Sequence, residues 1–144
     1  MANIRSAGLT LCALLSMLAS GCESASDIPG GRYNRSFVFD NDETVSAESV
    51  TPTSGARTIR INGVFEAPGG CHNLVSQIDD DNRELEVTIT AQAGSGTCNE
   101  TNNFFRYTMI TGFFFPGSYH LRIVHTDPAK GTRTMYDASI AVQF

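Results

Sequence analysis

The chain beyond residue 56 is marked by an alternation of apolar and polar residues. In the segment 84–91, Leu85, Val87 and Ile89 alternate with glutamate and threonine residues. Successive side chains of a β-strand point to opposite faces of the sheet, so this period of two predicts a strand with one buried face. The segments 57–65 and 118–125 repeat the pattern and indicate further half-buried strands.

Short strands separated by turn-forming residues account for the whole pattern. We expect strands at 33–40, 57–65, 72–78, 84–91, 104–110, 118–125 and 135–144. Residues 43–56 are rich in serine and threonine and contain Pro52 and Gly55, so we expect a loop there, with a short edge strand at most near Val50. The helical period is absent after residue 31. About seven such strands predict an all-β fold, a single antiparallel β-sandwich with one core.

The first residues have the features of an export signal. Arg5 precedes the apolar run Leu9–Leu18, which is too short to cross a membrane because a spanning helix needs about 20 residues. The sequence Leu-Ala-Ser-Gly-Cys that ends at Cys22 resembles the lipobox of bacterial lipoproteins. The resemblance implies cleavage before Cys22, a diacylglycerol on that cysteine, and a protein anchored in the bacterial envelope. The alternative is an ordinary secretory signal with cleavage beside an unrelated cysteine.

The lipobox also divides the chain into three parts. Residues 1–21 are the expected signal peptide, residues 22–31 are small, polar and glycine-rich and suit a flexible tether, and residues 32–144 form the domain. Glu23 follows the lipid-bearing cysteine, and in this class of protein that favours the outer membrane over the inner one. Cleavage removes Arg5 and no acidic residue, so the formal net charge of −5 becomes −6. An acidic chain without a basic cluster argues against nucleic acid as a partner.

Two cysteines remain in the expected domain once the signal peptide and Cys22 are set aside. An even pair, Cys71 and Cys98, in a chain sent to an oxidising compartment predicts one disulfide. The alternative is a pair of free thiols or metal ligands, but no Cys-x-x-Cys spacing supports a zinc site.

The segment from Phe115 to Ile123 begins Phe-Pro-Gly-Ser-Tyr-His-Leu. It resembles the Pro-Gly-x-Tyr-x-Leu run that opens a late strand in fibronectin III-like and bacterial immunoglobulin-like sandwiches. The resemblance implies an Ig-like fold in which Tyr119 forms a tyrosine corner, with its hydroxyl bonded back to the backbone. The order of Cys71, the 84–91 strand, Cys98 and this run is similar to small Ig-like domains of envelope lipoproteins.

Candidate chemistry is sparse. Neighbouring residues of an extended chain point apart, so Cys71 and His72 do not predict a thiol nucleophile. The acidic run 79–84 could offer oxygen ligands to calcium, but it lacks the glycine and the ligand spacing of an EF-hand loop, and a solvated turn explains it as well. His120 and His125 have opposite parity on their strand and predict no metal site. We therefore expect no catalytic residues, metal or cofactor.

Phe113, Phe114 and Phe115 form the most unusual local feature. Three consecutive aromatic residues cannot all face the interior of a strand. Either they form a buried corner beside Tyr119, or at least one is exposed as a contact surface.

These observations predict a lipid-anchored, non-enzymatic binding or assembly module whose partner is a protein or glycan. A small protease inhibitor that presents residues 43–56 or 113–117 is the alternative, and a small hydrolase ranks below both.

Overall fold

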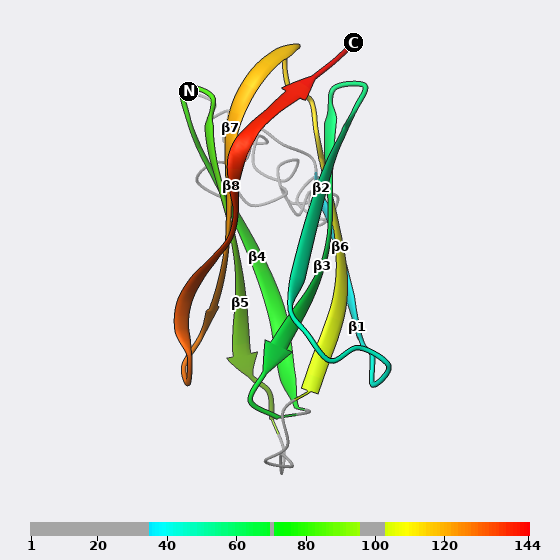
Figure 1. Cartoon of the computed structure of the whole chain (residues 1–144), viewed down its shortest axis with the longest axis vertical. Coiled ribbons are helices and arrows are strands. Elements are labelled where there is room, and N and C mark those ends of the chain that lie inside the picture. Colours follow the sequence, from blue (N-terminus) through cyan, green and yellow to red (C-terminus); the bar gives the residue numbers. More distant parts are fainter. Residues whose placement is uncertain (1–34, 70, 96–102) are drawn as a thin grey trace, which may run out of the picture.

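A computed structural model describes residues 35–69, 71–95 and 103–144, which fold as a two-layer β-sandwich (Figure 1). In these residues, one sheet has the strand order β1-β6-β3-β2 and the other β4-β5-β7-β8. The predicted all-β sandwich is confirmed. The strands are β1 (Arg35–Asn41), β2 (Ser49–Gly55), β3 (Thr58–Ala67), β4 (His72–Asp81), β5 (Glu84–Ala93), β6 (Asn103–Gly112), β7 (Gly117–Asp127) and β8 (Gly131–Val142).

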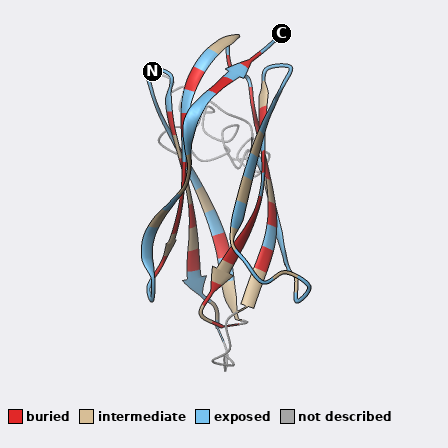
Figure 2. Ribbon diagram, viewed as in Figure 1, coloured by how far each residue is buried: buried red, intermediate tan, exposed pale blue. Residues whose placement is uncertain are grey.

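Alternating residues of the strands fill the space between the sheets. Leu85, Val87 and Ile89 of β5 are all buried, and Ile59 and Ile61 of β3 are fully enclosed. Buried and exposed bands alternate along the strands in Figure 2. Burial of each such side chain contributes roughly 1.5–3 kcal/mol, so this pattern sets which face of each strand points inward.

The described part of the chain has one strand more than the seven predicted and one pair of strands in an unexpected direction. The last strand, predicted at 135–144, spans Gly131–Val142, and β4 continues to Asp81. Residues 49–55 form a full strand, β2, rather than a loop, because they pair with β3 along the edge of the first sheet. Pro52 fits an edge strand because its missing N–H need not bond to a neighbour. In the second sheet β5 and β7 pair in parallel, so the prediction of a wholly antiparallel sandwich is wrong at this pair. The chain leaves the sheet after β5, forms β6 in the other layer, and returns in the original direction.

One end of the sandwich gathers three segments that are far apart in the sequence. Thr58 pairs with Gly112, which places the β2–β3 turn beside the link from β6 to β7. The backbone N–H of Arg57 donates to the carbonyl of Gln143 at 2.8 Å, and Ala56 and Gln143 form an isolated bridge. We call this end, with residues 56–57, 113–116 and 143–144, the aromatic end; it is at the top of Figure 1.

Candidate functional site

The link between β6 and β7 presents two phenylalanines to solvent. Phe113 is 61% exposed and Phe115 is 73% exposed, whereas Phe114 is buried in the core. Phe113 has a φ of 71°, in the left-handed region that side chains rarely adopt, and this turn allows Phe114 to point inward. The sequence left open a buried corner or an exposed contact surface. The structure combines the two, because Phe114 is buried and the phenylalanines on either side of it are exposed.

Several contacts fix the backbone of this link. The Phe114 ring packs edge-on against Tyr119, with centroids 5.3 Å apart. The Tyr119 hydroxyl donates to the carbonyl of Phe115 at 2.9 Å, the kind of bond that a tyrosine corner implies. Arg57 adds two bonds, because its carbonyl accepts from the Phe114 N–H at 3.3 Å and its Nε donates to the Phe114 carbonyl at 3.3 Å. The exposed rings therefore project from an anchored backbone.

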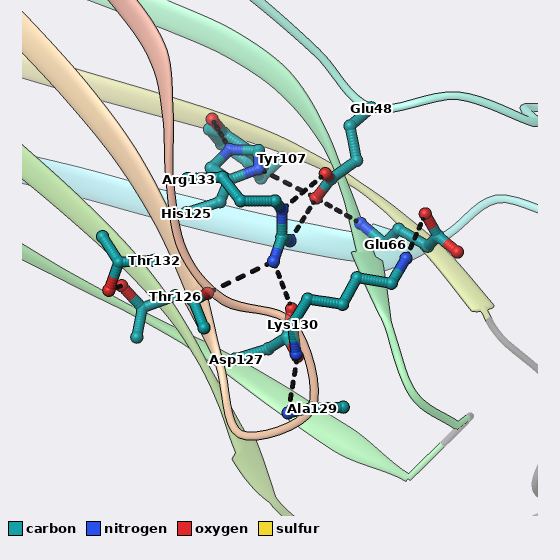
Figure 3. Close-up of polar contacts among 11 residues, drawn as sticks. Glu48, Glu66, Tyr107, His125, Thr126, Asp127, Ala129, Lys130, Thr132 and Arg133 are labelled. Carbon is teal, nitrogen blue, oxygen red and sulfur yellow. Dashed lines mark hydrogen bonds and ion pairs between the residues drawn. The ribbon is translucent and has the colours of Figure 1, made fainter.

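A second feature is a polar cluster inside the opposite half of the sandwich (Figure 3). We call Glu48, Tyr107, His125, Asp127 and Arg133 the polar clamp. Nδ1 of His125 lies 3.1 Å from a Glu48 carboxylate oxygen, where it donates. Nε2 of His125 then accepts from the Tyr107 hydroxyl at 2.9 Å. Arg133 donates two bonds to Glu48, at 2.8 and 3.0 Å, and one to Asp127 at 2.7 Å.

The clamp shifts the ionisation of its members. Burial alone would raise the pKa of Glu48, but the hydrogen bonds from His125 and Arg133 outweigh it and lower that pKa to about 2. Burial likewise opposes the shift at Asp127, whose pKa is lowered by the backbone N–H of Lys130 and by Arg133. Burial, with the charge of Glu48, raises the pKa of Tyr107. Glu48 and Asp127 are thus held ionised and the Tyr107 hydroxyl is held as a donor.

The polar clamp has the residue types of an acid–base relay but not the access. His125 is fully buried and Tyr107 is 1% exposed, so a substrate cannot reach either side chain in this structure. The His125 ring instead stacks on Phe65, with centroids 4.7 Å apart. The clamp ties the connection before β2 to β6, β7 and β8. No sequence signal predicts it, because Glu48 and Arg133 are 85 residues apart.

The outer face of the second sheet carries an acidic groove. It is lined by Leu85 and by the charged side chains Asp79, Asp81, Glu84, Glu86, His120, Arg122 and Asp137. His120 lies between two carboxylates, with Nδ1 2.7 Å from Glu84 and Nε2 2.8 Å from Asp137. The hydrogen bond to Glu84 is the main cause that raises the pKa of His120. Within residues 35–69, 71–95 and 103–144, no three His, Cys, Asp or Glu side chains are grouped to hold a metal ion.

The remaining sequence predictions fall partly outside the described residues. Cys71 lies in the turn before β4, where its carbonyl accepts from the N–H of Gly94 at 2.8 Å. Cys98 and Cys22 are outside the described residues, as are residues 1–34. The disulfide, the lipid anchor, the signal peptide and the tether therefore stay predictions. In the part of the chain that is described, no helix is long and apolar enough to cross a membrane.

The chain was compared with protein families, curated proteins and solved structures. No protein-family model, no curated protein and no solved structure matches the chain.

Proposed function

We propose that the protein is a lipid-anchored lipoprotein of the bacterial envelope whose sandwich is a non-enzymatic binding or assembly module. Its contact surface is the β6–β7 link, with Phe113 and Phe115 as the contacting side chains. The observation that carries this proposal is the exposure of both rings, 61% and 73%, on a backbone anchored by Phe114 and Tyr119.

The energetics of that link favour a contact role. Exposed aromatic side chains contribute nothing to the core, and neighbouring ones mark surfaces that bind a partner or a membrane. Large rings held in one geometry lose little conformational entropy on binding, which is why aromatic residues dominate binding hot spots. The ionisable groups with the strongest shifts, by contrast, sit in the polar clamp, where His125 and Tyr107 are buried, and this arrangement supports structure rather than turnover.

An immunoglobulin-like or fibronectin III-like identity belongs to the same proposal. The bond from the Tyr119 hydroxyl to the Phe115 carbonyl and the long β7–β8 hairpin support it. The parallel pair of β5 and β7 is a departure from the antiparallel pairing of those folds. A disulfide between Cys71 and Cys98 would tie the start of β4 to the chain that follows β5.

A photo-crosslinking residue at position 115, introduced into the full chain in intact cells, tests the contact surface. Val38 is the matched control position because it is 60% exposed on β1. We expect adducts at position 115 and far fewer at position 38, with their chemistry read by mass spectrometry. Equal yields at the two positions, or none at 115, would contradict the proposal.

The anchor has a separate test. Cys22→Ser should abolish acyl labelling and release the protein from membranes, because each acyl CH₂ contributes about 0.8 kcal/mol to membrane binding. Membrane association that is unchanged in this variant would refute the lipoprotein assignment.

A protease inhibitor is the second candidate, because the same link is rigid and exposed. Residues 49–55 lie in an edge strand, so residues 113–117 are the better inhibitory loop of the two expected from the sequence. Stoichiometric loss of protease activity on titration with the protein would favour this candidate over the binding module.

A further inference from the structure

The chain enters the sandwich at the aromatic end. Arg35, the first residue of β1, pairs with Thr111, and Phe113 follows two residues later. A tether formed by the N-terminal segment would therefore attach to the end that carries the exposed phenylalanines.

The β4–β5 turn also lies at the aromatic end, because the Arg83 carbonyl accepts the N–H of His120 at 2.9 Å and the Arg83 guanidinium lies 5.5 Å from the centroid of the Tyr119 ring. This turn carries the exposed carboxylates of Asp81 and Glu84. The opposite end holds the β1–β2, β3–β4 and β7–β8 connections.

The aromatic end has more apolar surface than the β6–β7 link alone. Phe144 is 94% exposed and follows Gln143, whose carbonyl accepts the N–H of Arg57. Three exposed phenylalanines are thus connected through one hydrogen-bonded group of segments. Arg57 is exposed and its Nε donates to the Phe114 carbonyl, so a guanidinium suited to bind a phosphate lies beside the β6–β7 link.

The length of the N-terminal segment limits how the domain can face a membrane. Twelve residues lie between Cys22 and Arg35, and the thirteen steps from one Cα to the other span at most about 45 Å when fully extended. A flexible tether of that length, as the sequence predicts, would have a typical end-to-end distance of about 20 Å. The sandwich itself is roughly 35–40 Å long, because β8 has 12 residues at about 3.3 Å each. To place the opposite end on the membrane, the tether would have to run almost fully stretched along the domain.

We propose that the aromatic end rests on the lipid bilayer, with Phe113 and Phe115 inserted at the interface between headgroups and acyl chains. This inference rests on the proposed function, because it takes Cys22 as the lipid anchor and the β6–β7 link as the contact surface. It names that surface's partner as lipid. The contact is apolar rather than electrostatic, since the expected mature chain is acidic and anionic lipid would repel it.

Because the lipid on Cys22 would already hold the protein at the membrane, a weak contact of the phenylalanines is sufficient to orient the domain. Two phenylalanines alone do not hold an acidic protein on a membrane, but the lipid on Cys22 makes their insertion an intramolecular event. Such linkage raises the effective concentration and can strengthen overall binding by about 10²–10⁴-fold. The bilayer contact would fix the orientation of the domain, hold the polar clamp half away from the membrane and leave both outer sheet faces exposed at the sides.

The absence of tryptophan from the chain allows a direct test by fluorescence. Phe115→Trp in the full-length acylated protein, reconstituted into phosphatidylcholine vesicles with brominated acyl chains, places a single reporter at the aromatic end. Val38→Trp is the control. We expect blue-shifted emission and quenching of about half the signal at position 115, because interfacial insertion reaches about 5–10 Å into the bilayer boundary. The control should emit as in water.

Each other outcome has a distinct meaning. If both variants float with the vesicles but Trp at position 115 is not quenched, the orientation inference is overturned while the anchor stands. Equal quenching at positions 38 and 115 also overturns it, because the domain would then lie on its side. Failure of both variants to float overturns the anchor and the inference together. Crosslinks from position 115 to a protein, without lipid adducts, would overturn the lipid partner and leave the proposed contact surface intact.

Discussion

Replacing Glu48 by glutamine removes the charge at the centre of the polar clamp. The contacts of Glu48 lower its pKa from 4.5 to about 2 although burial opposes the shift. One pKa unit corresponds to about 1.4 kcal/mol, so the ionised carboxylate contributes about 3 kcal/mol relative to its protonated form. The Glu48 side chain is 14% exposed, so solvent screens the interaction only slightly. Glutamine resembles the protonated carboxyl, and Glu48→Gln should therefore lose about 3 kcal/mol near neutral pH.

The same reasoning predicts how this loss depends on pH. The pKa of Glu48 is lower in the folded state than in the unfolded state, so its contribution is fully present above about pH 4.5. It is lost as the pH falls through the folded-state value of about 2. The difference between Glu48→Gln and the parent should therefore be largest near neutral pH, shrink between pH 4.5 and 2, and vanish below that.

Urea unfolding followed by circular dichroism measures both quantities, in a Cys22→Ser background so that no lipid interferes. Glu43→Gln is the matched control, because Glu43 is exposed in the same β1–β2 connection and should change stability by less than about 0.5 kcal/mol. A loss below about 1 kcal/mol near neutral pH would refute the assigned strength of the clamp. A loss that persists unchanged at pH 2 would show that packing, and not charge, is responsible.

Three further predictions concern other parts of the sandwich. Gly63→Ala should cost about 2 kcal/mol in thermal unfolding, because the added Cβ would lie 2.3 Å from the Tyr107 ring; an unchanged melting temperature would contradict this packing. Joint replacement of Cys71 and Cys98 by serine should cost about 3–4 kcal/mol through loss of loop-closure entropy, and a parent protein with two titratable thiols would exclude the disulfide. The pKa of His120 is raised, so its stabilising contribution is full below pH 6.5 and is lost as pH rises through the folded-state value; NMR titration should give a pKa above 6.5, and His120→Gln should remove that pH dependence.

The strands were predictable from the sequence where a single face is buried. In β5 and β7 the period of two follows directly from the pleat, and the apolar residues Leu85 and Tyr119 point inward as expected. In β2 the period is hidden by Ser, Thr and Pro52, because an edge strand needs few apolar contacts and takes its stability from pairing with β3. Strand order depends on contacts between distant segments, so the local pattern of apolar and polar residues could not predict the parallel pair of β5 and β7.

The candidate contact surface was likewise predictable from the sequence only in part. The sequence by itself singled out Phe113, Phe114 and Phe115, because no strand can bury three consecutive rings, and it singled out Tyr119 through its Pro-Gly context. Which ring is buried was decided by the positive φ of Phe113 and by the bonds from Arg57, a residue from a turn more than fifty positions away.

The tertiary structure alone decided the polar clamp and the composition of the aromatic end. Glu48 and Arg133 carry no local signal, since an ion pair depends on distance in space and not on spacing along the chain. The aromatic end likewise exists only because Arg35 pairs with Thr111 and Arg57 bonds to Gln143. Local sequence determined which residues face the core, whereas the pairing of distant strands determined which exposed residues share an end.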